Sequence, residues 1–209
     1  MSILVTGATG FIGKSLLKDL ASYDGIIFIL VRPVSIKKAI SQFKENPNVK
    51  IIVGDLTNPS VLEDLNDLLL ISDVKQLIHL GGEYDIEMNK DRAYMQNVVG
   101  TQNILALSKK IPKLETIHLV SSFSVIGTQK KIAFADDFAS DQERISPYAQ
   151  SKLVSEKITR KFINENKKIK LFVYRPGIVI PNFSTKLEKI DGPYYFLENI
   201  LKLEKVLKI

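Results

Sequence analysis

Short apolar runs rich in β-branched residues alternate along this chain of 209 residues with longer segments in which apolar residues recur three and four positions apart. The runs predict six strands buried on both faces, at Ile3–Thr6, Ile26–Val31, Val49–Val53, Gln76–Leu80, Thr116–Val120 and Lys170–Tyr174. The spacing between them predicts helices at Ile12–Ala21, Ile36–Phe43, Pro59–Leu68, Met88–Lys110 and Tyr148–Asn164. Such alternation requires right-handed crossovers, so the sequence predicts an α/β fold with a doubly wound parallel sheet and helices on both faces.

The composition excludes several classes of protein. The chain has no cysteine, which excludes disulfides, thiolate catalysis and cysteine-ligated metals. Its two histidines, His79 and His118, lie inside apolar runs, where we expect hydrogen-bonded core residues, so no metal site is predicted. The net charge of +6 comes from scattered lysines, which does not favour nucleic-acid binding. No apolar run approaches the ~20 residues of a membrane helix and no signal peptide is visible, so we expect a cytoplasmic protein without a membrane span.

A glycine-rich turn follows the first predicted strand and leads directly into the first predicted helix. Its sequence is Thr6-Gly7-Ala8-Thr9-Gly10-Phe11-Ile12-Gly13. Gly7 permits a tight turn, Gly10 lets the backbone approach a pyrophosphate, and Gly13 allows close packing of helix on strand. The spacing is G-x-x-G-x-x-G rather than G-x-G-x-x-G, but its place between strand and helix is the one that dinucleotide binding requires. Residues 1–180 are therefore predicted to be an NAD(P)-binding domain of the Rossmann type.

Residues at the ends of the next two strands bear on the choice of cofactor. Arg32 ends the second strand, where an acidic residue would bind the ribose hydroxyls of NAD and an arginine can pair with the 2′-phosphate of NADP. NADP is therefore favoured, with NAD as the alternative if Arg32 is only a solvated side chain. Asp55 follows the third strand, where it could bind adenine or cap a turn.

A phenol and an ammonium four residues apart indicate acid–base chemistry. Tyr148 and Lys152 share one face of a predicted helix, and the lysine is expected to lower the pKa of the phenol and to bind the nicotinamide ribose. A run rich in hydroxyls, Ser121-Ser122-Phe123-Ser124, directly follows the fifth strand, whose carboxyl end faces the ligand crevice of a doubly wound sheet.

Together with the glycine loop, these residues resemble the extended branch of the short-chain dehydrogenase/reductase superfamily, over a stretch from Thr6 to Tyr195. The resemblance implies Ser122, Tyr148, Lys152 and Asn97 as catalytic residues, with Tyr148 as proton donor and Asn97 as support for the active-site backbone. It also implies cofactor contacts from Gly7, Thr9, Gly10, Phe11, Ile12, Gly13, Arg32, Asp55, Leu56, Leu80, Gly81, Gly82, Tyr148, Lys152, Pro176, Gly177 and Ile178.

Finer similarities point to one part of that branch. The segment His79-Leu80-Gly81-Gly82-Glu83-Tyr84-Asp85 is similar to the H-L-A-A-x-Y-D stretch of fatty acyl-CoA reductase-like and thioester reductase-like proteins, although glycines replace both alanines. After Pro176–Gly177 the chain is polar and then amphipathic over Tyr194–Lys208. Residues 181–209 are predicted to begin a C-terminal substrate-binding lobe that is cut short.

These features favour an NADP-dependent oxidoreductase that reduces a carbonyl or acyl thioester of a lipid-like small molecule. The alternatives are an NAD-dependent sugar-nucleotide epimerase or dehydratase, which Arg32 disfavours, and a non-catalytic cofactor-sensing module, which the presence of both Tyr148 and Lys152 disfavours. A homodimer is left open.

Overall fold

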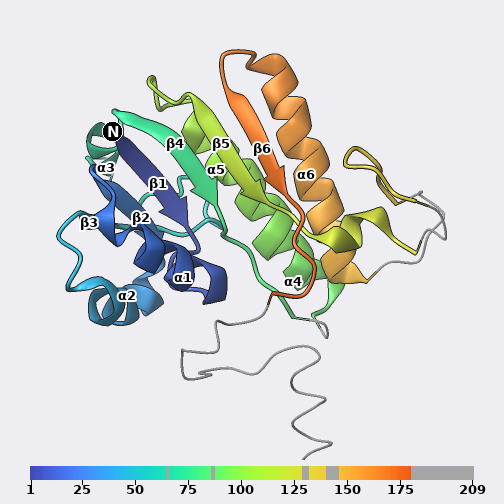
Figure 1. Cartoon of the computed structure of the whole chain (residues 1–209), viewed down its shortest axis with the longest axis horizontal. Helices are drawn as coiled ribbons and strands as arrows, with labels where there is room; N and C mark the ends of the chain where they lie inside the picture. The colour runs from blue at the N-terminus through green and yellow to red at the C-terminus, as the bar shows by residue number, and fades with distance from the viewer. Residues whose placement is uncertain (65, 86–87, 129–131, 140–145, 180–209) are drawn as a thin grey trace, which may run out of the picture. The chain divides into compact units, whose positions relative to one another are not determined.

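Six parallel strands form one sheet in the order β3-β2-β1-β4-β5-β6, as the computed structural model of the chain shows (Figure 1). The strands are β1 Ser2–Thr6, β2 Ile27–Val31, β3 Val49–Val53, β4 Val74–His79, β5 Thr116–Val120 and β6 Lys170–Tyr174. All six predicted strands are therefore confirmed, with ends that shift by at most two residues. The order and the parallel pairing confirm the predicted doubly wound Rossmann-type sheet.

The structure describes residues 1–64, 66–85, 88–128, 132–139 and 146–179. The chain divides into two units, Met1–Arg175 and Pro176–Ile209, and the sheet belongs to the first. The amphipathic segment Tyr194–Lys208 and the lobe predicted for 181–209 lie outside the described residues. No helix in the described part of the chain is long and apolar enough to cross a membrane.

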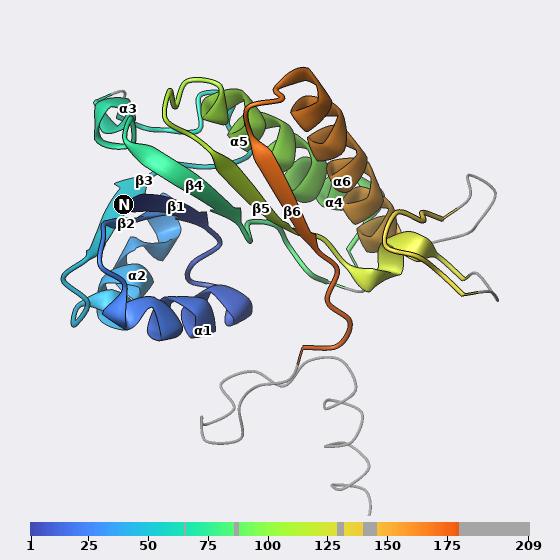
Figure 2. The same cartoon turned by 45° about the horizontal axis from the view of Figure 1, so that its top comes forward.

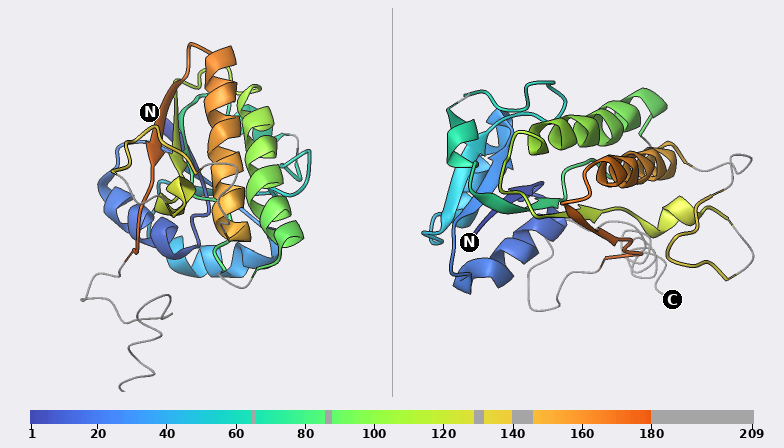
Figure 3. Two further views of the ribbon diagram at one scale, coloured as in Figure 1. Left: turned by 90° about the vertical axis from the view of Figure 1, so that its right-hand side faces the viewer. Right: turned by 90° about the horizontal axis from the view of Figure 1, so that it is seen from above.

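Helices cover both faces of the sheet (Figures 2 and 3). They are α1 Phe11–Asp19, α2 Ile36–Phe43, α3 Asp67–Leu70, α4 Lys90–Ala93, α5 Gly100–Ser108 and α6 Pro147–Glu165. A π-helical segment, Tyr94–Val99, joins α4 to α5 without a break, and 3₁₀ turns occur at Leu20–Ser22, Pro33–Ser35 and Phe123–Ile126. The predicted helix over 88–110 is thus present, but its middle is wound more loosely than an α-helix.

Alternate residues of the central strands build two separate cores. Ile3 and Val5 of β1 pack on the face covered by α1 and α2, together with Leu17 of α1. Leu4, between them in sequence, packs on the opposite face with residues of α5 and α6. Because successive side chains of a strand point to opposite faces, a strand that serves both cores must be apolar throughout, and β1 and β2 are fully buried.

Three local predictions are wrong. The segment predicted as a helix over Pro59–Leu68 consists mainly of turns, because the Asn58 side chain accepts a hydrogen bond from the Ser60 amide and Val61 adopts a positive φ of 62°. Strands β3 and β6 are not buried on both faces, since they form the two edges of the sheet. Only Ile52 of β3 is buried, and the residues of β6 alternate between exposed and half-buried. His118 is only half-buried, where it stacks on Phe172 of β6.

The order of the strands creates the ligand crevice. The chain moves outward from β1 to β3 on one side, returns to β4 beside β1, and moves outward again to β6. In a doubly wound sheet, ligands bind where this direction reverses, at the carboxyl ends of the two central strands. Those ends are Thr6 of β1 and His79 of β4, which are paired neighbours.

Candidate active site

The glycine loop lies against the end of β4, and the contact is made by backbone. Gly7 has a φ of +72°, and a Cβ there would lie 2.7 Å from the carbonyl carbon of Leu80. A Cβ on Gly13 would lie 2.3 Å from the carbonyl oxygen of Gly7, whereas one on Gly10 would meet only that oxygen, at 3.1 Å. The loop therefore needs glycine at 7 and 13 for its own packing, and at 10 it leaves open space.

The open side of this loop fits a dinucleotide. Gly10 and Phe11 are exposed, while Thr9 and Ile12 are half-buried. Helix α1 starts at Phe11, and among the described residues no side chain caps it. The amide groups of its first turn and the positive end of the helix dipole are thus suited to the pyrophosphate, as the sequence predicts.

The ends of β2 and β3 carry the residues predicted to contact the adenosine half. Arg32 directly follows β2 and is exposed, and its guanidinium forms no ion pair or hydrogen bond with any other described residue. Asp55 Oδ1 accepts hydrogen bonds from the amide and the hydroxyl of Thr57, both at 2.8 Å. The structure thus shows Asp55 in the turn role, and its contact with adenine stays a prediction.

Glycines 81 and 82 stand where similar proteins carry alanine, and packing explains both. The Gly81 amide donates to Thr6 Oγ1 at 2.9 Å, and a Cβ on Gly81 would lie 2.5 Å from Leu56 Cδ1. Gly82 has a φ of +151°, and its Cβ would lie 2.9 Å from Asn97 Oδ1. Leu56, predicted as a cofactor contact, therefore also packs against the segment that follows β4.

The predicted catalytic side chains meet at the carboxyl end of β5. Helix α6 begins where the Ser146 hydroxyl accepts from the Ala149 amide at 3.1 Å, which places Tyr148 in its first turn. One turn later, Lys152 Nζ donates to the carbonyl oxygen of Val120 at 2.6 Å. Ser122 Oγ accepts from the hydroxyl of Ser124 at 2.8 Å and lies close enough to the Tyr148 hydroxyl to affect its pKa. The structure thus brings Ser122, Tyr148 and Lys152 together.

The electrostatics of this group differ from the sequence-based expectation in one respect. Burial raises the pKa of Tyr148, the nearby hydroxyl of Ser122 opposes this, and Tyr84 adds to the rise. The expected lowering of that pKa by Lys152 is therefore not observed, and Lys152 is held by the Val120 carbonyl. Burial lowers the pKa of Lys152 to about 8, while Glu156 acts in the opposite direction. At neutral pH Tyr148 is protonated and Lys152 is mostly charged.

Asn97 clamps the segment that follows β4. Its Oδ1 accepts from the amide of Glu83 at 2.7 Å, and its Nδ2 donates to the carbonyl of Glu83 at 3.1 Å and to Ser151 Oγ at 2.9 Å. Asn97 is buried within the π-helical segment, a kind of distortion that often marks functional sites. The clamp holds Tyr84 where its ring meets that of Tyr148 edge-on, with centroids 5.0 Å apart. Asn97 thus holds the backbone of the segment that follows β4, and its part in catalysis stays a prediction.

Comparison with known proteins assigns the chain to a family. A family model described as Male sterility protein matches residues 5–206. The chain belongs to this family. Its relatives include NAD(P)-dependent reductases and epimerases, which confirms the resemblance to the extended short-chain dehydrogenase/reductase superfamily and its thioester reductase-like branch.

Individual relatives of this male sterility family member fall into two groups. UDP-glucuronate 4-epimerase 1 of Arabidopsis thaliana is 30% identical over 78% of this chain and 39% of its own length. The polyketide synthase-nonribosomal peptide synthetase phmA of Phaeosphaeria nodorum is 24% identical over 97% of this chain and 5% of its own length. The solved terminal R domain of the myxalamid PKS-NRPS pathway has a TM-score of 0.72 and 26% identity, over 84% of this chain and 49% of that one. The chain thus spans less than half the length of these relatives.

His79, at the end of β4, joins the end of β1 to helix α5 across the crevice. Its Nδ1 lies 2.7 Å from Thr6 Oγ1, and its Nε2 lies 3.2 Å from Thr101 Oγ1, which donates to the carbonyl of Asn97. Because Thr101 donates its only hydroxyl proton to the carbonyl of Asn97, its oxygen must accept from Nε2, so we assign the ring proton to Nε2, and Nδ1 accepts from Thr6 Oγ1. Burial and the charge of Lys152 lower the pKa of His79 to about 3. The prediction of a hydrogen-bonded core histidine is confirmed for His79.

Three residues of this site were not found from the sequence, namely Thr6 and Thr101 beside His79, and Glu156 beyond Lys152. The available signal was a polar residue at the end of a fully apolar strand for Thr6, and an acid one helical turn after Lys152 for Glu156. Pro176, Gly177 and Ile178 belong to the second unit, and their contact with the cofactor stays a prediction.

Proposed function

We propose that this chain is the cofactor-binding and catalytic part of an NADPH-dependent reductase that acts on a carbonyl or acyl thioester of a lipid-like substrate. The observation that carries the proposal is the meeting of Ser122, Tyr148 and Lys152 at the end of β5, beside a glycine loop built to receive a dinucleotide. The likeness to thioester-reducing synthetase domains over almost the whole chain supports the substrate class.

The proposed mechanism follows from the positions and charges of these side chains. Bound NADPH would supply the hydride that reduces the carbonyl carbon. Tyr148, kept protonated by burial, gives its proton to the carbonyl oxygen, and Ser122 donates a hydrogen bond that polarises the same oxygen. The ammonium of Lys152, held by the carbonyl of Val120, would orient the ribose of the bound cofactor.

The preference for NADPH over NADH is proposed on the basis of Arg32. Its guanidinium is exposed at the end of β2 and has no partner within the described chain, and the second strand does not end in an acid that would bind the 2′-hydroxyl. A charged planar group of this kind can form charge-assisted hydrogen bonds with a 2′-phosphate.

An epimerase acting on a nucleotide sugar is the second candidate, because the Arabidopsis epimerase is 30% identical to this chain. A reductase and an epimerase of this type use the same kind of Tyr–Lys pair. The two functions therefore have to be distinguished by the substrates that the protein accepts. Purified protein that includes this chain would be given NADPH with an acyl thioester in one assay, and NAD with UDP-glucuronate in another. Oxidation of NADPH dependent on the thioester supports the reductase, and formation of an epimer with no NADPH oxidation overturns it.

The catalytic assignment is tested with Tyr148→Phe. The ring still packs against Tyr84 and only the hydroxyl is lost, so NADPH affinity should change little while turnover falls ~10²–10⁴-fold. The matched control is Tyr94→Phe, because Tyr94 is an exposed tyrosine of the π-helical segment, and its turnover should stay normal. Full activity of Tyr148→Phe would show that Tyr148 is not the proton donor.

A further inference from the structure

A carboxylate is completely buried one helical turn beyond Lys152. Glu156 of α6 has no exposed surface, and three guanidinium hydrogen bonds hold its side chain. Arg175 donates from Nε to Oε2 at 3.0 Å and from Nη2 to Oε1 at 2.8 Å, and Arg160 donates from Nε to Oε1 at 2.9 Å. A buried carboxylate without such partners would strongly destabilise the folded chain. These bonds outweigh the effect of burial and keep the pKa of Glu156 below its usual value.

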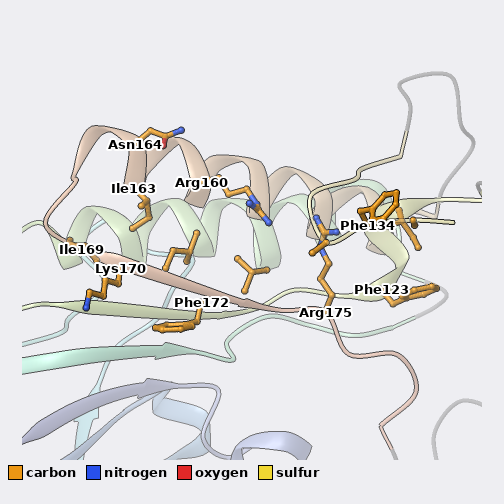
Figure 4. Close-up of a pocket in the computed structure, with 14 residues that line it drawn as sticks. Phe123, Phe134, Arg160, Ile163, Asn164, Ile169, Lys170, Phe172 and Arg175 are labelled. Carbon is orange, nitrogen blue, oxygen red and sulfur yellow. The ribbon is translucent and has the colours of Figure 1, made fainter.

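Contacts with other residues hold the two arginines in place. Arg175 ends the first unit just after β6, donates from Nη1 to the carbonyl of Asp137 at 2.9 Å, and lies 4.8 Å from the ring centroid of Phe138. Arg160 Nη1 pairs with Asp136 Oδ1 at 3.0 Å. Figure 4 shows Arg160 pointing from α6 toward the sheet and Arg175 pointing from the end of β6 toward α6, beside a pocket of about 950 Å³. The side chain of Glu156 is therefore held in a single position and stays ionised.

Glu156 and Lys152 reach neighbouring residues of the same strand end. Lys152 donates to the carbonyl of Val120, and the hydroxyl of the next residue, Ser121, lies beside the carboxylate of Glu156. Ser121 Oγ is buried and makes no hydrogen bond of normal geometry within the described chain. Residues four apart share one face of a helix, so the negative charge of Glu156 lies one turn from the ammonium of Lys152, in a region from which water is largely excluded.

We propose that Glu156 is a positioning residue for catalysis: its fixed carboxylate keeps Lys152 charged and directed at the end of β5, where the lysine can bind the ribose of the cofactor. This inference rests on the proposed reductase function. Burial alone drives Lys152 toward the neutral form, and the carboxylate is the group that opposes it. Arg175, which donates to both carboxylate oxygens, allows Glu156 to remain ionised without water.

The other charged and titratable groups around this pair are few in the described structure. Tyr148 lies one helical turn before Lys152 on α6 and is uncharged at neutral pH, while His79 on β4 faces Lys152 and stays neutral because burial lowers its pKa to about 3. Arg160 on α6, Arg175 after β6 and, through Arg160, Asp136 surround Glu156. None of the groups that face Lys152 other than Glu156 supplies a negative charge at neutral pH.

The direct test is to follow the titration of Lys152 in the expressed protein by NMR of the lysine Cε signals. The signal of Lys152 is the one that is missing from the spectrum of Lys152→Gln. In Glu156→Gln the pKa of Lys152 should fall from about 8 by about one pH unit, since loss of a neighbouring opposite charge has an effect of that size. The matched control is Glu165→Gln, because Glu165 is an exposed acid at the end of α6, and the Lys152 titration should not move. An unchanged Lys152 titration in Glu156→Gln overturns the proposal.

A second variant keeps the test open if Glu156→Gln does not fold. Arg160→Gln removes a positive charge from a partly exposed position and leaves the carboxylate in place, so the pKa of Lys152 should rise. A fall or no change in Arg160→Gln would contradict the proposal.

Turnover with NADPH and a thioester separates this role from a purely structural one. In Glu156→Gln the alkaline limb of the pH profile should move down by about one pH unit, with turnover at pH 6 within about twofold of the parent. A structural defect would lower turnover equally at every pH and would count against the proposal. If Lys152 titrates as expected but no variant affects NADPH-dependent turnover, Glu156 sets the charge of Lys152 and the proposed reductase function is wrong.

Discussion

The two sides of the crevice are built by different means. On the nucleotide side, backbone meets backbone: Gly7 lies against Leu80, and Gly13 lies against Gly7. On the catalytic side, side chains distant in sequence hold one another, as Asn97 holds Ser151 across 54 positions. At Gly7 and Gly13 the first arrangement tolerates no added atom, whereas the second tolerates no lost hydrogen bond or charge. Substitutions should therefore fail for steric reasons on one side and for electrostatic reasons on the other.

The largest effect is expected where the backbone contacts are tightest. Gly13→Val would place a Cβ 2.3 Å from the carbonyl oxygen of Gly7 and 2.6 Å from the Cα of Ala8, and neither backbone atom can move without displacing β1. Overpacking of this kind costs about 3 kcal/mol or more. Chemical denaturation should show that loss in the free energy of unfolding.

Gly10→Val is the control on the same loop. Its Cβ would meet only the Gly7 oxygen, at 3.1 Å, so the domain should keep nearly its full stability. The side chain would instead project toward the pyrophosphate and should abolish NADPH binding in a fluorescence titration. If Gly10→Val binds NADPH normally, this loop does not hold the pyrophosphate, and the contrast between the two sides of the crevice loses its basis.

The nucleotide side could be predicted from the sequence because its determinants are local. A strand, three glycines and a helix start occur within 13 residues, and each glycine has its own steric reason. The same local reasoning gave the wrong structure at Pro59, where the polar residues before the proline form turns of their own in place of a helix cap. Side-chain hydrogen bonds to nearby backbone compete with helix formation, and the spacing of apolar residues does not reveal which one wins.

The next prediction concerns Arg32, and it tests whether a charged side chain also contributes to binding on the nucleotide side. Arg32→Ala should weaken NADPH binding by roughly 1.5–3 kcal/mol, which is about a tenfold to hundredfold loss of affinity, because a charge-assisted phosphate contact is removed. Affinity for NADH should be unchanged, and Lys37→Ala, which removes a nearby exposed charge, should have a smaller effect. Parallel titrations with both cofactors measure the difference. If the parent protein binds NADH more tightly than NADPH, Arg32 does not bind a 2′-phosphate and is only a solvated side chain.

The catalytic side could be predicted only as far as a family resemblance carried it. Ser122, Tyr148, Lys152 and Asn97 were placed by their similarity to known motifs, and the structure brings them together. Glu156 was missed because its partner Arg175 lies on another element, 19 positions away. A buried acid looks like any surface acid in a sequence until the residue that neutralises it is known.

The smallest effect concerns His79, the residue that joins the two sides. It bonds Thr6 at the nucleotide end and Thr101 toward Asn97, and it can do both only as the neutral ring, because one nitrogen must accept. The unfolded chain binds a proton at this histidine near pH 6.5, but the folded chain does so only near pH 3. Between those values the unfolded state holds more protons, so stability falls as pH falls, by about 1.4 kcal/mol per pH unit from this residue.

Comparing the free energy of unfolding at pH 6.5 and 5.5 should show a shallower loss in His79→Gln than in the parent. The other histidine provides the control: His118 is half-buried at the surface of the sheet, so His118→Gln should change the slope much less. If His79→Gln loses stability with pH as steeply as the parent protein, His79 is already charged in the folded state, and the polar connection between the two sides of the crevice does not exist in the form described.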